Sequence, residues 1–234
     1  MKLKIKRFIN DRNYFDEYDI DFKEDETILE LLDRVRNKDR TLTYRSFCRS
    51  SICGTCAIRV NGKTILACKS KVKNLIENNS LVIEPVNRVK VIKDLVVDNS
   101  FIEEKINKVN GWFVDKIDET KENLQTPEKL KKYDKQTDCI LCGACFYECD
   151  ALDYEQDYAG PFAFTKVFRF VFDSRDKMDK QQRIEIAKKN FLYSCVNCQK
   201  CALVCPKGIS SMMDIKMLQL EDKNPPFNEN NLFF

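Results

Sequence analysis

The sequence contains no histidine, and this absence removes several common kinds of active site. Without imidazole there is no Ser-His-Asp triad, no Cys-His catalytic pair and no histidine ligand for a metal ion. Glycine is also scarce, and the six glycines form neither the G-x-G-x-x-G loop nor the P-loop. The chain is therefore not expected to bind flavin, NAD or ATP through a glycine loop, and any cofactor must be held by thiolates.

Long hydrophobic segments are missing as well. The first ten residues, MKLKIKRFIN, alternate charged and apolar side chains and lack the apolar core of a secretory signal. The most hydrophobic stretch, at 160–172, is broken by Lys166 and Arg169, and no run approaches the roughly 18 apolar residues of a membrane span. The net charge of +3 is dispersed, which provides no basic field for nucleic acid. We expect a cytoplasmic protein whose cysteines are kept reduced.

Cysteine, by contrast, is abundant. The 12 cysteines lie in FCRSSICGTC at 47–56, DCILCGACFYECD at 138–150 and SCVNCQKCALVCP at 194–206, with Cys68 alone outside these stretches. In a reducing compartment such clustering indicates metal or redox chemistry rather than disulfides.

The first cysteine set predicts a [2Fe–2S] cluster. Cys48, Cys53, Cys56 and Cys68 follow the C-x4-C-x2-C…C spacing of plant-type ferredoxins. Small residues such as Gly54 allow backbone N–H groups of a tight loop to approach the anionic sulfurs. Four cysteines can also bind zinc, but this spacing is unusual for a zinc ribbon.

The second and third cysteine runs share the spacing C-x2-C-x2-C-x3-C of bacterial two-cluster ferredoxins. In that arrangement the first three cysteines of a run hold one cubane cluster, and the fourth reaches across to the other cluster. The alternatives are zinc or two independent structural sites. The predicted ligands are Cys139, Cys142, Cys145 and Cys205 for one [4Fe–4S] cluster, and Cys149, Cys195, Cys198 and Cys201 for the third cluster.

The predicted fold class is α+β, with residues 1–93 as the first domain. Apolar residues alternate as in half-buried strands at 3–5 and 18–22 and form a strand at 81–86. A capping box of Thr27 and Glu30 precedes a helical apolar face at 28–35, and Asn61-Gly62 predicts a hairpin turn. These elements predict a curved mixed sheet wrapped over one helix.

The remaining chain is predicted to be helical. Residues 94–137 are interpreted as a connecting segment with one helix, because Ile102, Ile106, Val109 and Phe113 have helical spacing. Residues 138–234 are predicted to form an all-α domain with two clusters and a C-terminal tail. The aromatics of 164–172 alternate as in a strand, but we predict a helix because the stretch lies between two helical cysteine loops.

Three clusters in one chain predict an electron relay. Iron–sulfur clusters store single electrons at potentials that depend on ligands, hydrogen bonds and solvent access. With neither a flavin loop nor a catalytic base, the chain is expected to perform no substrate catalysis itself. It would pass electrons between partners that carry out two-electron chemistry.

The order of these motifs resembles that of the iron–sulfur subunit of the succinate dehydrogenase/fumarate reductase family. The resemblance spans nearly the whole chain and rests on CRSSICGTCAIRVNGKTILAC, DLVVD at 94–98, DCILCGAC, GPFAFTKVFRFVFDSRD and CALVCPKG. It implies an N-terminal β-grasp [2Fe–2S] ferredoxin domain followed by an all-α ferredoxin-like domain with two clusters.

The same resemblance implies two partners. One is an FAD-containing succinate/fumarate flavoprotein subunit, and the other is a membrane-anchor subunit or a cysteine-rich quinone- or thiol-linked subunit. Through these partners the chain would lie peripherally on the inner face of the membrane. The direction of electron flow and the nature of the distal partner stay open.

Two positions depart from the family pattern. Family members usually carry a [3Fe–4S] third cluster with a non-cysteine residue where Cys198 stands, so Cys198 predicts [4Fe–4S] here, with [3Fe–4S] as the alternative. The tryptophan and histidine that help form the common quinone site are replaced at Asp153, Tyr154 and Val196. This favours the variant group with a cysteine-rich anchor, or a soluble thiol-linked fumarate reductase.

Three functional hypotheses follow. The leading one is the electron-transfer subunit of a succinate dehydrogenase/fumarate reductase complex. The same relay could instead serve another dehydrogenase or a disulfide-linked reductase. The alternative from a different class is a zinc-stabilised binding module, which predicts a colourless zinc protein rather than a brown one with about ten irons.

Overall fold

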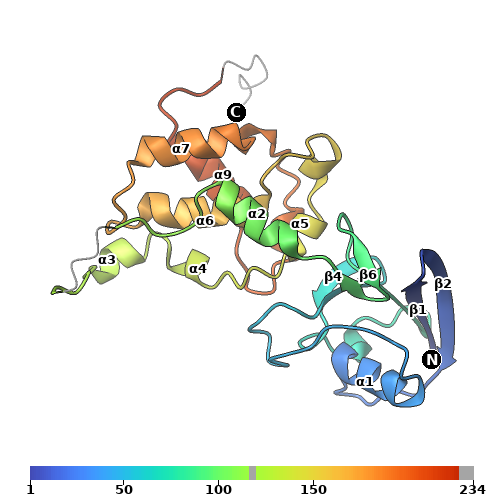
Figure 1. Cartoon of the computed structure of the whole chain (residues 1–234). Coiled ribbons are helices and arrows are strands. Elements are labelled where there is room, and N and C mark those ends of the chain that lie inside the picture. Colours follow the sequence, from blue (N-terminus) through green and yellow to red (C-terminus); the bar gives the residue numbers. More distant parts are fainter. Residues whose placement is uncertain (116–119, 227–234) are drawn as a thin grey trace.

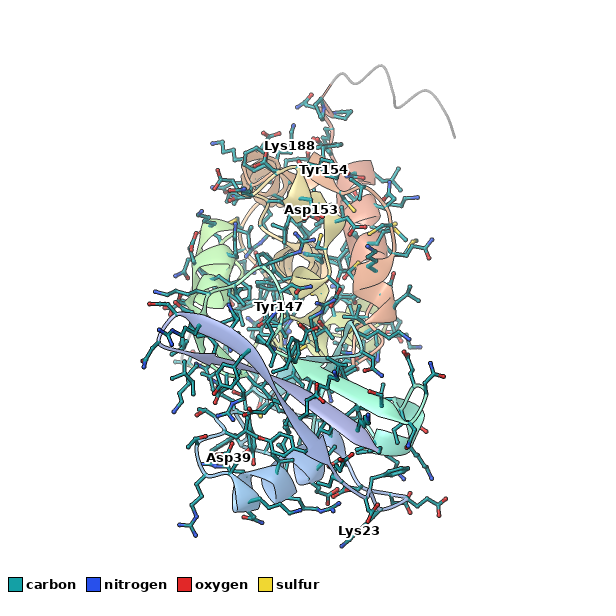
Figure 2. The ribbon with its side chains drawn as sticks, turned by 90° about the vertical axis from the view of Figure 1, so that its right-hand side faces the viewer. Lys23, Asp39, Tyr147, Asp153, Tyr154 and Lys188 are labelled. Atoms are coloured by element: carbon teal, nitrogen blue, oxygen red, sulfur yellow. The ribbon has the colours of Figure 1, made fainter. Side chains whose placement is uncertain are left out.

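The computed structural model describes residues 1–115 and 120–226, which form a sheet-containing part and a helical part joined by a connecting segment (Figure 1). Figure 2, turned by 90°, shows the same division, with Tyr147 near the level where the two parts meet. The last residues of the predicted C-terminal tail, 227–234, lie outside the described residues.

The first part contains the predicted mixed sheet. Its strands have the order β2-β1-β5-β3-β4, with β1 and β5 parallel and the other neighbours antiparallel. Helix α1 packs its apolar face on this sheet, and Leu31, Leu32 and Val35 share one core with Leu3 and Ile83. The elements are β1 (Lys2–Ile9), β2 (Arg12–Asp19), α1 (Ile28–Lys38), β3 (Ala57–Val60), β4 (Lys63–Leu66), η1 (Val72–Asn74) and β5 (Ser80–Glu84).

Local sequence signals account for two of these elements. Thr27 and Glu30 form the predicted capping box of α1, with the Glu30 N–H donating to Thr27 Oγ1 at 3.2 Å and the Thr27 N–H to Glu30 Oε2 at 2.8 Å. Asn61 and Gly62 join β3 to β4 with φ values of 46° and 77°. Two positive φ angles are what a tight two-residue hairpin requires.

The strand predicted at 18–22 lies mostly earlier in the chain. Strand β2 covers Arg12–Asp19, and it follows a hairpin turn at Asn10 and Asp11, which both have positive φ. Strand β2 is an edge strand, and its first four residues are all exposed. Because neither face of its first half is buried, its sequence carries no apolar alternation to predict it.

A short hairpin connects the two parts. It consists of β6 (Val91–Lys93) and β7 (Val96–Val97), and α2 (Ser100–Lys108) follows it. Asp94 in its turn is fully buried and accepts a hydrogen bond from Arg7 Nε at 3.0 Å. The predicted boundary after residue 93 falls inside this hairpin, and the three domain ranges stay a prediction.

The second part is helical. The predicted helix at 164–172 is confirmed as part of α6, which is buried on nearly all sides because it packs against α2, α4, α5, α7 and α9. Its elements are α3 (Pro127–Leu130), α4 (Asp134–Thr137), α5 (Ala144–Tyr147), η2 (Asp150–Asp153), α6 (Pro161–Phe172), α7 (Lys180–Lys189), η3 (Leu192–Ser194), α8 (Lys200–Leu203) and α9 (Ser211–Leu220). In the ranges that the structure describes, no helix has both the length and the hydropathy to span a membrane.

Candidate metal centres

The loop between α1 and β3 directs backbone N–H groups at the first cysteine set. The N–H groups of Ser50, Ile52 and Cys53 donate to Cys48 Sγ at 3.4, 3.3 and 3.2 Å. These hydrogen bonds, first among them that of Ser50, stabilise the thiolate and lower the pKa of Cys48 to about 6. The loop therefore supplies the inward-facing N–H groups that a tight cysteine loop was expected to have.

The other thiols of this set are linked to the same loop. The Ser51 N–H donates to Cys68 Sγ at 3.3 Å, which ties the loop to the end of the β3–β4 hairpin. Burial raises the pKa of Cys56 to about 12, and the nearby Cys68 and Cys53 thiols act in the same direction. The fold thus gathers all four predicted ligands of the first cluster.

Two cavities lie inside the helical part, and each is lined by four cysteines. The cavity at the predicted second cluster, here called the second cavity, is lined by Cys139, Cys142, Cys145 and Cys205. The cavity at the predicted third cluster, here called the third cavity, is lined by Cys149, Cys195, Cys198 and Cys201. Each cavity takes thiols from both cysteine runs. This is the grouping that the spacing predicted, while the role of the thiols as ligands stays a prediction.

The short helices α5 and α8 explain how the two runs cross. Cys145 lies on α5 and lines the second cavity, whereas Cys149 follows α5 and lines the third. Cys201 lies on α8 and lines the third cavity, whereas Cys205 follows α8 and lines the second. The two helices pack against each other, so each passes one thiol to each side. A Lys200–Asp150 ion pair of 2.6 Å also joins the two runs.

Burial raises the pKa of several cavity thiols. It brings the pKa of Cys142 to about 11 and that of Cys149 to about 12, and it raises that of Cys145 well above the ordinary value. Buried thiolates that crowd together need a cationic partner, and iron ions provide one. Cys198 is the only one of the 12 cysteines that is exposed.

The arrangement of the cysteines does not match a site for a single metal ion. A tetrahedral zinc ion needs its sulfurs about 2.3 Å from a common point. Within residues 1–115 and 120–226, no group of three or more Cys, Asp or Glu side chains is arranged to hold one metal ion.

The wall of the third cavity also contains a buried tyrosine hydroxyl. Tyr158 lines this cavity and is completely buried. Its hydroxyl makes no well-formed hydrogen bond in the described part of the chain, although it lies near the Cys195 thiol. Buried donors nearly always have a partner. The sulfur atoms of an iron–sulfur cluster accept hydrogen bonds, so this hydroxyl fits such a group.

The second cavity carries hydroxyl groups whose hydrogen bonds are satisfied. Thr165 on α6 and Ser211 on α9 both line it. Thr165 Oγ1 lies 2.9 Å from Ser211 Oγ and 2.7 Å from Oδ2 of the buried Asp214. The Gln136 amide donates to Asp214 Oδ1 at 2.7 Å. Burial, countered by these two hydrogen bonds, raises the pKa of Asp214 to about 6.

Sequence reasoning missed these residues. Thr165 and Asp214 are polar residues in largely apolar stretches, which was a weak signal that they face something polar. Tyr158 gave no signal, since aromatic residues are common in cores.

The first and second cysteine sets touch at Gly54. A Cβ atom at Gly54 would lie 2.6 Å from Cys142 Cβ, and the φ of Gly54 is +71°. The sequence had suggested only that Gly54 allows N–H groups near sulfur. The structure shows that its missing side chain also lets the first loop approach the second cysteine set.

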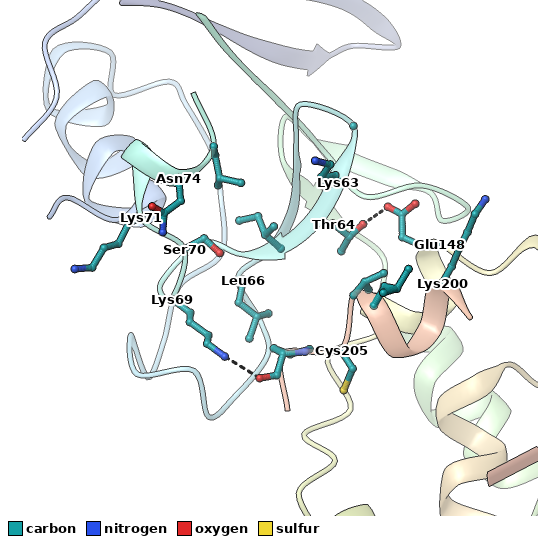
Figure 3. Close-up of a pocket in the computed structure, with 16 residues that line it drawn as sticks. Lys63, Thr64, Leu66, Lys69, Ser70, Lys71, Asn74, Glu148, Lys200 and Cys205 are labelled. Carbon is teal, nitrogen blue, oxygen red and sulfur yellow. Dashed lines mark hydrogen bonds between the residues drawn. The ribbon is translucent and has the colours of Figure 1, made fainter. Parts of the chain in front are cut away.

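Polar contacts hold the two parts together around these sets. Figure 3 shows β4 facing the segment around Cys205, with the Thr64 hydroxyl donating to Glu148 and Lys69 Nζ donating to the Pro206 carbonyl at 2.9 Å. Ile140 and Cys142 pack against the core of the first part. The cysteine sets therefore belong to one continuous packed structure.

Known proteins show the same organisation. A family model described as a 2Fe-2S iron-sulfur cluster binding domain matches residues 2–104, and one described as a 4Fe-4S dicluster domain matches residues 135–209. The 8-methylmenaquinol:fumarate reductase iron-sulfur subunit of Wolinella succinogenes is 39% identical over 231 residues, which covers 94% of this chain and 72% of that protein. The chain belongs to the iron–sulfur subunits of the succinate dehydrogenase/fumarate reductase family.

Other iron–sulfur subunits are similar to this chain in sequence or in fold. The mitochondrial succinate dehydrogenase [ubiquinone] iron-sulfur subunits of Dictyostelium discoideum and Candida glabrata are 30% and 31% identical to this chain. The matches cover 88% of this chain in both cases, and 76% and 84% of those proteins. A chain of the Mycobacterium smegmatis Sdh1 complex has the same fold, with a TM-score of 0.84 at 22% identity over 97% of this chain and 98% of that one.

Family membership confirms the main predictions. The chain is an electron-transfer subunit of an oxidoreductase complex, and it has one [2Fe–2S] domain and one [4Fe–4S] dicluster domain. The α+β fold with a β-grasp domain and a helical ferredoxin-like domain is confirmed. The cluster-binding domains exclude the zinc-stabilised module as the main function.

Proposed function

We propose that this iron–sulfur subunit passes single electrons in line through its first, second and third clusters, between an FAD-containing flavoprotein and a quinol-linked membrane partner. The supporting observation is the arrangement of the thiols. The first set touches the second at Gly54, and the second and third sets share α5 and α8. Electrons can therefore move between neighbouring sets without leaving the interior of the subunit.

The chain's own residues prepare these sites for electron transfer. Each cluster, when bound, takes up and releases one electron. The N–H groups of Ser50, Ile52 and Cys53 hold negative charge on Cys48, and the largely buried helix α6 contributes residues to the walls of the second and third cavities. No step requires a side chain of this subunit to accept a proton from substrate.

We propose that the third cluster is [4Fe–4S] and is held by Cys149, Cys195, Cys198 and Cys201. Cys198 lines the same cavity as the other three thiols. A fourth thiolate adds negative charge and favours a lower reduction potential than a [3Fe–4S] cluster would have.

The partner beyond the third cluster is proposed to supply a quinol. The relative from Wolinella succinogenes is named for 8-methylmenaquinol and fumarate. Near the third cysteine set this chain exposes Tyr154, Val196 and Leu203, with 84, 49 and 83% of their surface accessible. Figure 2 shows Tyr154 beside Asp153 in the helical part. Such apolar exposure suits a protein partner that places the subunit on the inner face of the membrane.

Asp153 takes no part in this exposed set. Its carboxylate is held by Arg88, with distances of 2.5 Å from Nη1 and 3.0 Å from Nη2. Asp153, which stands at a position of the common quinone site of the family, therefore forms an ion pair that links the two parts of the subunit.

Metal analysis of the complex purified from its native source without oxygen tests the proposal. The account predicts about ten irons per chain, an equal amount of acid-labile sulfide, little zinc, and a co-purifying flavoprotein that interconverts succinate and fumarate. A flavoprotein with another substrate would contradict the proposed partner. Reduction of the clusters by a dithiol but not by a menaquinol would favour the thiol-linked alternative.

A further inference from the structure

Tyr158 lies in the segment between η2 and α6, and its ring is fixed in the core of the helical part. The ring packs against Phe164, with centroids 5.3 Å apart and planes at 48°. The side chain is completely buried and lines the third cavity beside Cys149, Cys195 and Cys201. An aromatic ring packed in this way can present its hydroxyl in one fixed direction.

The hydroxyl of Tyr158 is a buried donor that makes no well-formed hydrogen bond in the part of the chain that the structure describes. It lies near the Cys195 thiol, one of the proposed ligands: burial raises the pKa of this thiol, and the Tyr158 hydroxyl offsets part of that rise. A tyrosine hydroxyl ordinarily titrates at about pH 10, so it carries its proton at neutral pH. Leaving that proton unpaired in the interior would cost free energy.

The second cavity differs in this respect. A hydroxyl carries one proton and a carboxylate can only accept, so the Thr165 proton belongs to its contact with Asp214. Thr165 Oγ1 can then act only as the acceptor in its 2.9 Å contact with Ser211, so the Ser211 proton is also used within the protein. Among the residues that line the two cavities, Tyr158 is the one whose buried side-chain donor makes no well-formed hydrogen bond within the described part of the chain.

We propose that the Tyr158 hydroxyl donates a hydrogen bond to a sulfur atom of the third cluster and raises the reduction potential of that cluster. The inference rests on the ligand set proposed above for the third cavity. Donors to cluster sulfur stabilise the reduced state, because that state carries the additional negative charge. No bond to iron and no proton transfer is involved.

This hydrogen bond would act against the effect of Cys198. A fourth thiolate lowers the reduction potential, whereas a donor at sulfur raises it. Tyr158 would therefore keep a four-thiolate third cluster at a potential from which it can exchange electrons with the partner. The two residues lie on different segments of the same cavity, so their effects can be measured separately.

The test is Tyr158→Phe in the intact complex, followed by redox titration with low-temperature spin resonance. The variant should shift the midpoint potential of the third cluster downward and leave the other two clusters unchanged. An exchangeable proton coupled to the third cluster should be visible by electron–nuclear double resonance in the unmodified complex and lost in the variant.

Tyr133→Phe is the matched control. Tyr133 is also buried, at 1% exposure, but its hydroxyl donates to Gln125 and does not line either cavity. This control should leave all three potentials unchanged. If the midpoint potential of the third cluster does not change in Tyr158→Phe at full iron content, or changes equally in the control, the proposed hydrogen bond is wrong. The proposed ligand set would be unaffected by that result. Absence of a third cluster from the unmodified complex would instead overturn the proposed ligand set, and the hydrogen bond with it.

Discussion

Gly54 is the residue at which the cysteine loop of the first part contacts Cys142 of the second part. Its positive φ disfavours any other residue, and the atoms of Cys142 occupy the space that a Cβ would need. Two separate costs therefore fall on one position, one from the backbone and one from the contact.

Gly54→Ala should destabilise the subunit and slow electron exchange between the first and second clusters. Steric overlap with Cys142 forces the two loops apart, and the positive φ adds about 1–2 kcal/mol of backbone strain. Thermal unfolding of the assembled complex and the reduction rate of the second cluster measure the two effects.

Gly208→Ala is the matched control for this substitution. Gly208 also has a positive φ, of +68°, but nothing lies within 4 Å of a Cβ placed there. It should show the backbone cost without the change in electron exchange. If both variants lose the same stability and the same reduction rate of the second cluster, the contact between Gly54 and Cys142 does not affect electron exchange.

In the proposed ligand set, Cys198 determines the composition of the third cluster. Cys198→Ser should convert it to a [3Fe–4S] cluster or to a serine-ligated [4Fe–4S] cluster, with about one iron lost in the first case. Iron analysis and the low-temperature spin-resonance spectrum report the change. A [3Fe–4S] spectrum in the unmodified protein, purified without oxygen, would show that Cys198 is no ligand.

At the scale of elements, α4, α6 and α9 meet at one buried carboxylate beside the second cavity. Asp214 on α9 is 3% exposed and is held by Thr165 of α6 and Gln136 of α4. Among the ion pairs found in the described residues, none involves Asp214. A buried negative charge without a cation disfavours the addition of an electron nearby.

Asp214→Asn should therefore raise the reduction potential of the second cluster at pH 8 while keeping the shape of the side chain. The difference from the unmodified subunit should shrink as the pH falls through the pKa of Asp214, about 6 without a cluster, because the carboxyl group then takes up a proton. Redox titrations at pH 8 and pH 5.5 measure both effects.

Glu185→Gln removes an equal charge from an exposed position on α7 and should leave the potential of the second cluster unchanged. If Asp214→Asn moves the potential no further than this control at either pH, the buried charge does not act on the cluster.

Different elements were predictable to different degrees. The cysteine sets could be read from spacing, because cluster ligands lie in short loops whose geometry is local. Helix α1 and the β3–β4 hairpin had capping and turn signals of their own. Strand β2 lacked such a signal, since it is a charged edge strand. Tyr158 and Asp214 gained their surroundings only when α6 packed against its neighbours, which no short stretch of sequence encodes.

At the scale of the whole molecule, the subunit places three thiol sets in a continuous path. The β-grasp part supplies the first set, and the crossing of two cysteine runs supplies the second and third. Contacts such as Lys69 to Pro206 and Arg88 to Asp153 hold the two parts in a fixed relation. The path leads from the loop at Cys48 to the exposed thiol of Cys198.

The most direct test of this account is a redox titration of the complete complex, followed by low-temperature spin resonance. The account predicts three separate one-electron signals, one of [2Fe–2S] and two of [4Fe–4S] type, with magnetic coupling between neighbouring clusters. Fewer than three signals in protein with its full iron content, or three signals without coupling, would contradict a relay of three adjacent clusters.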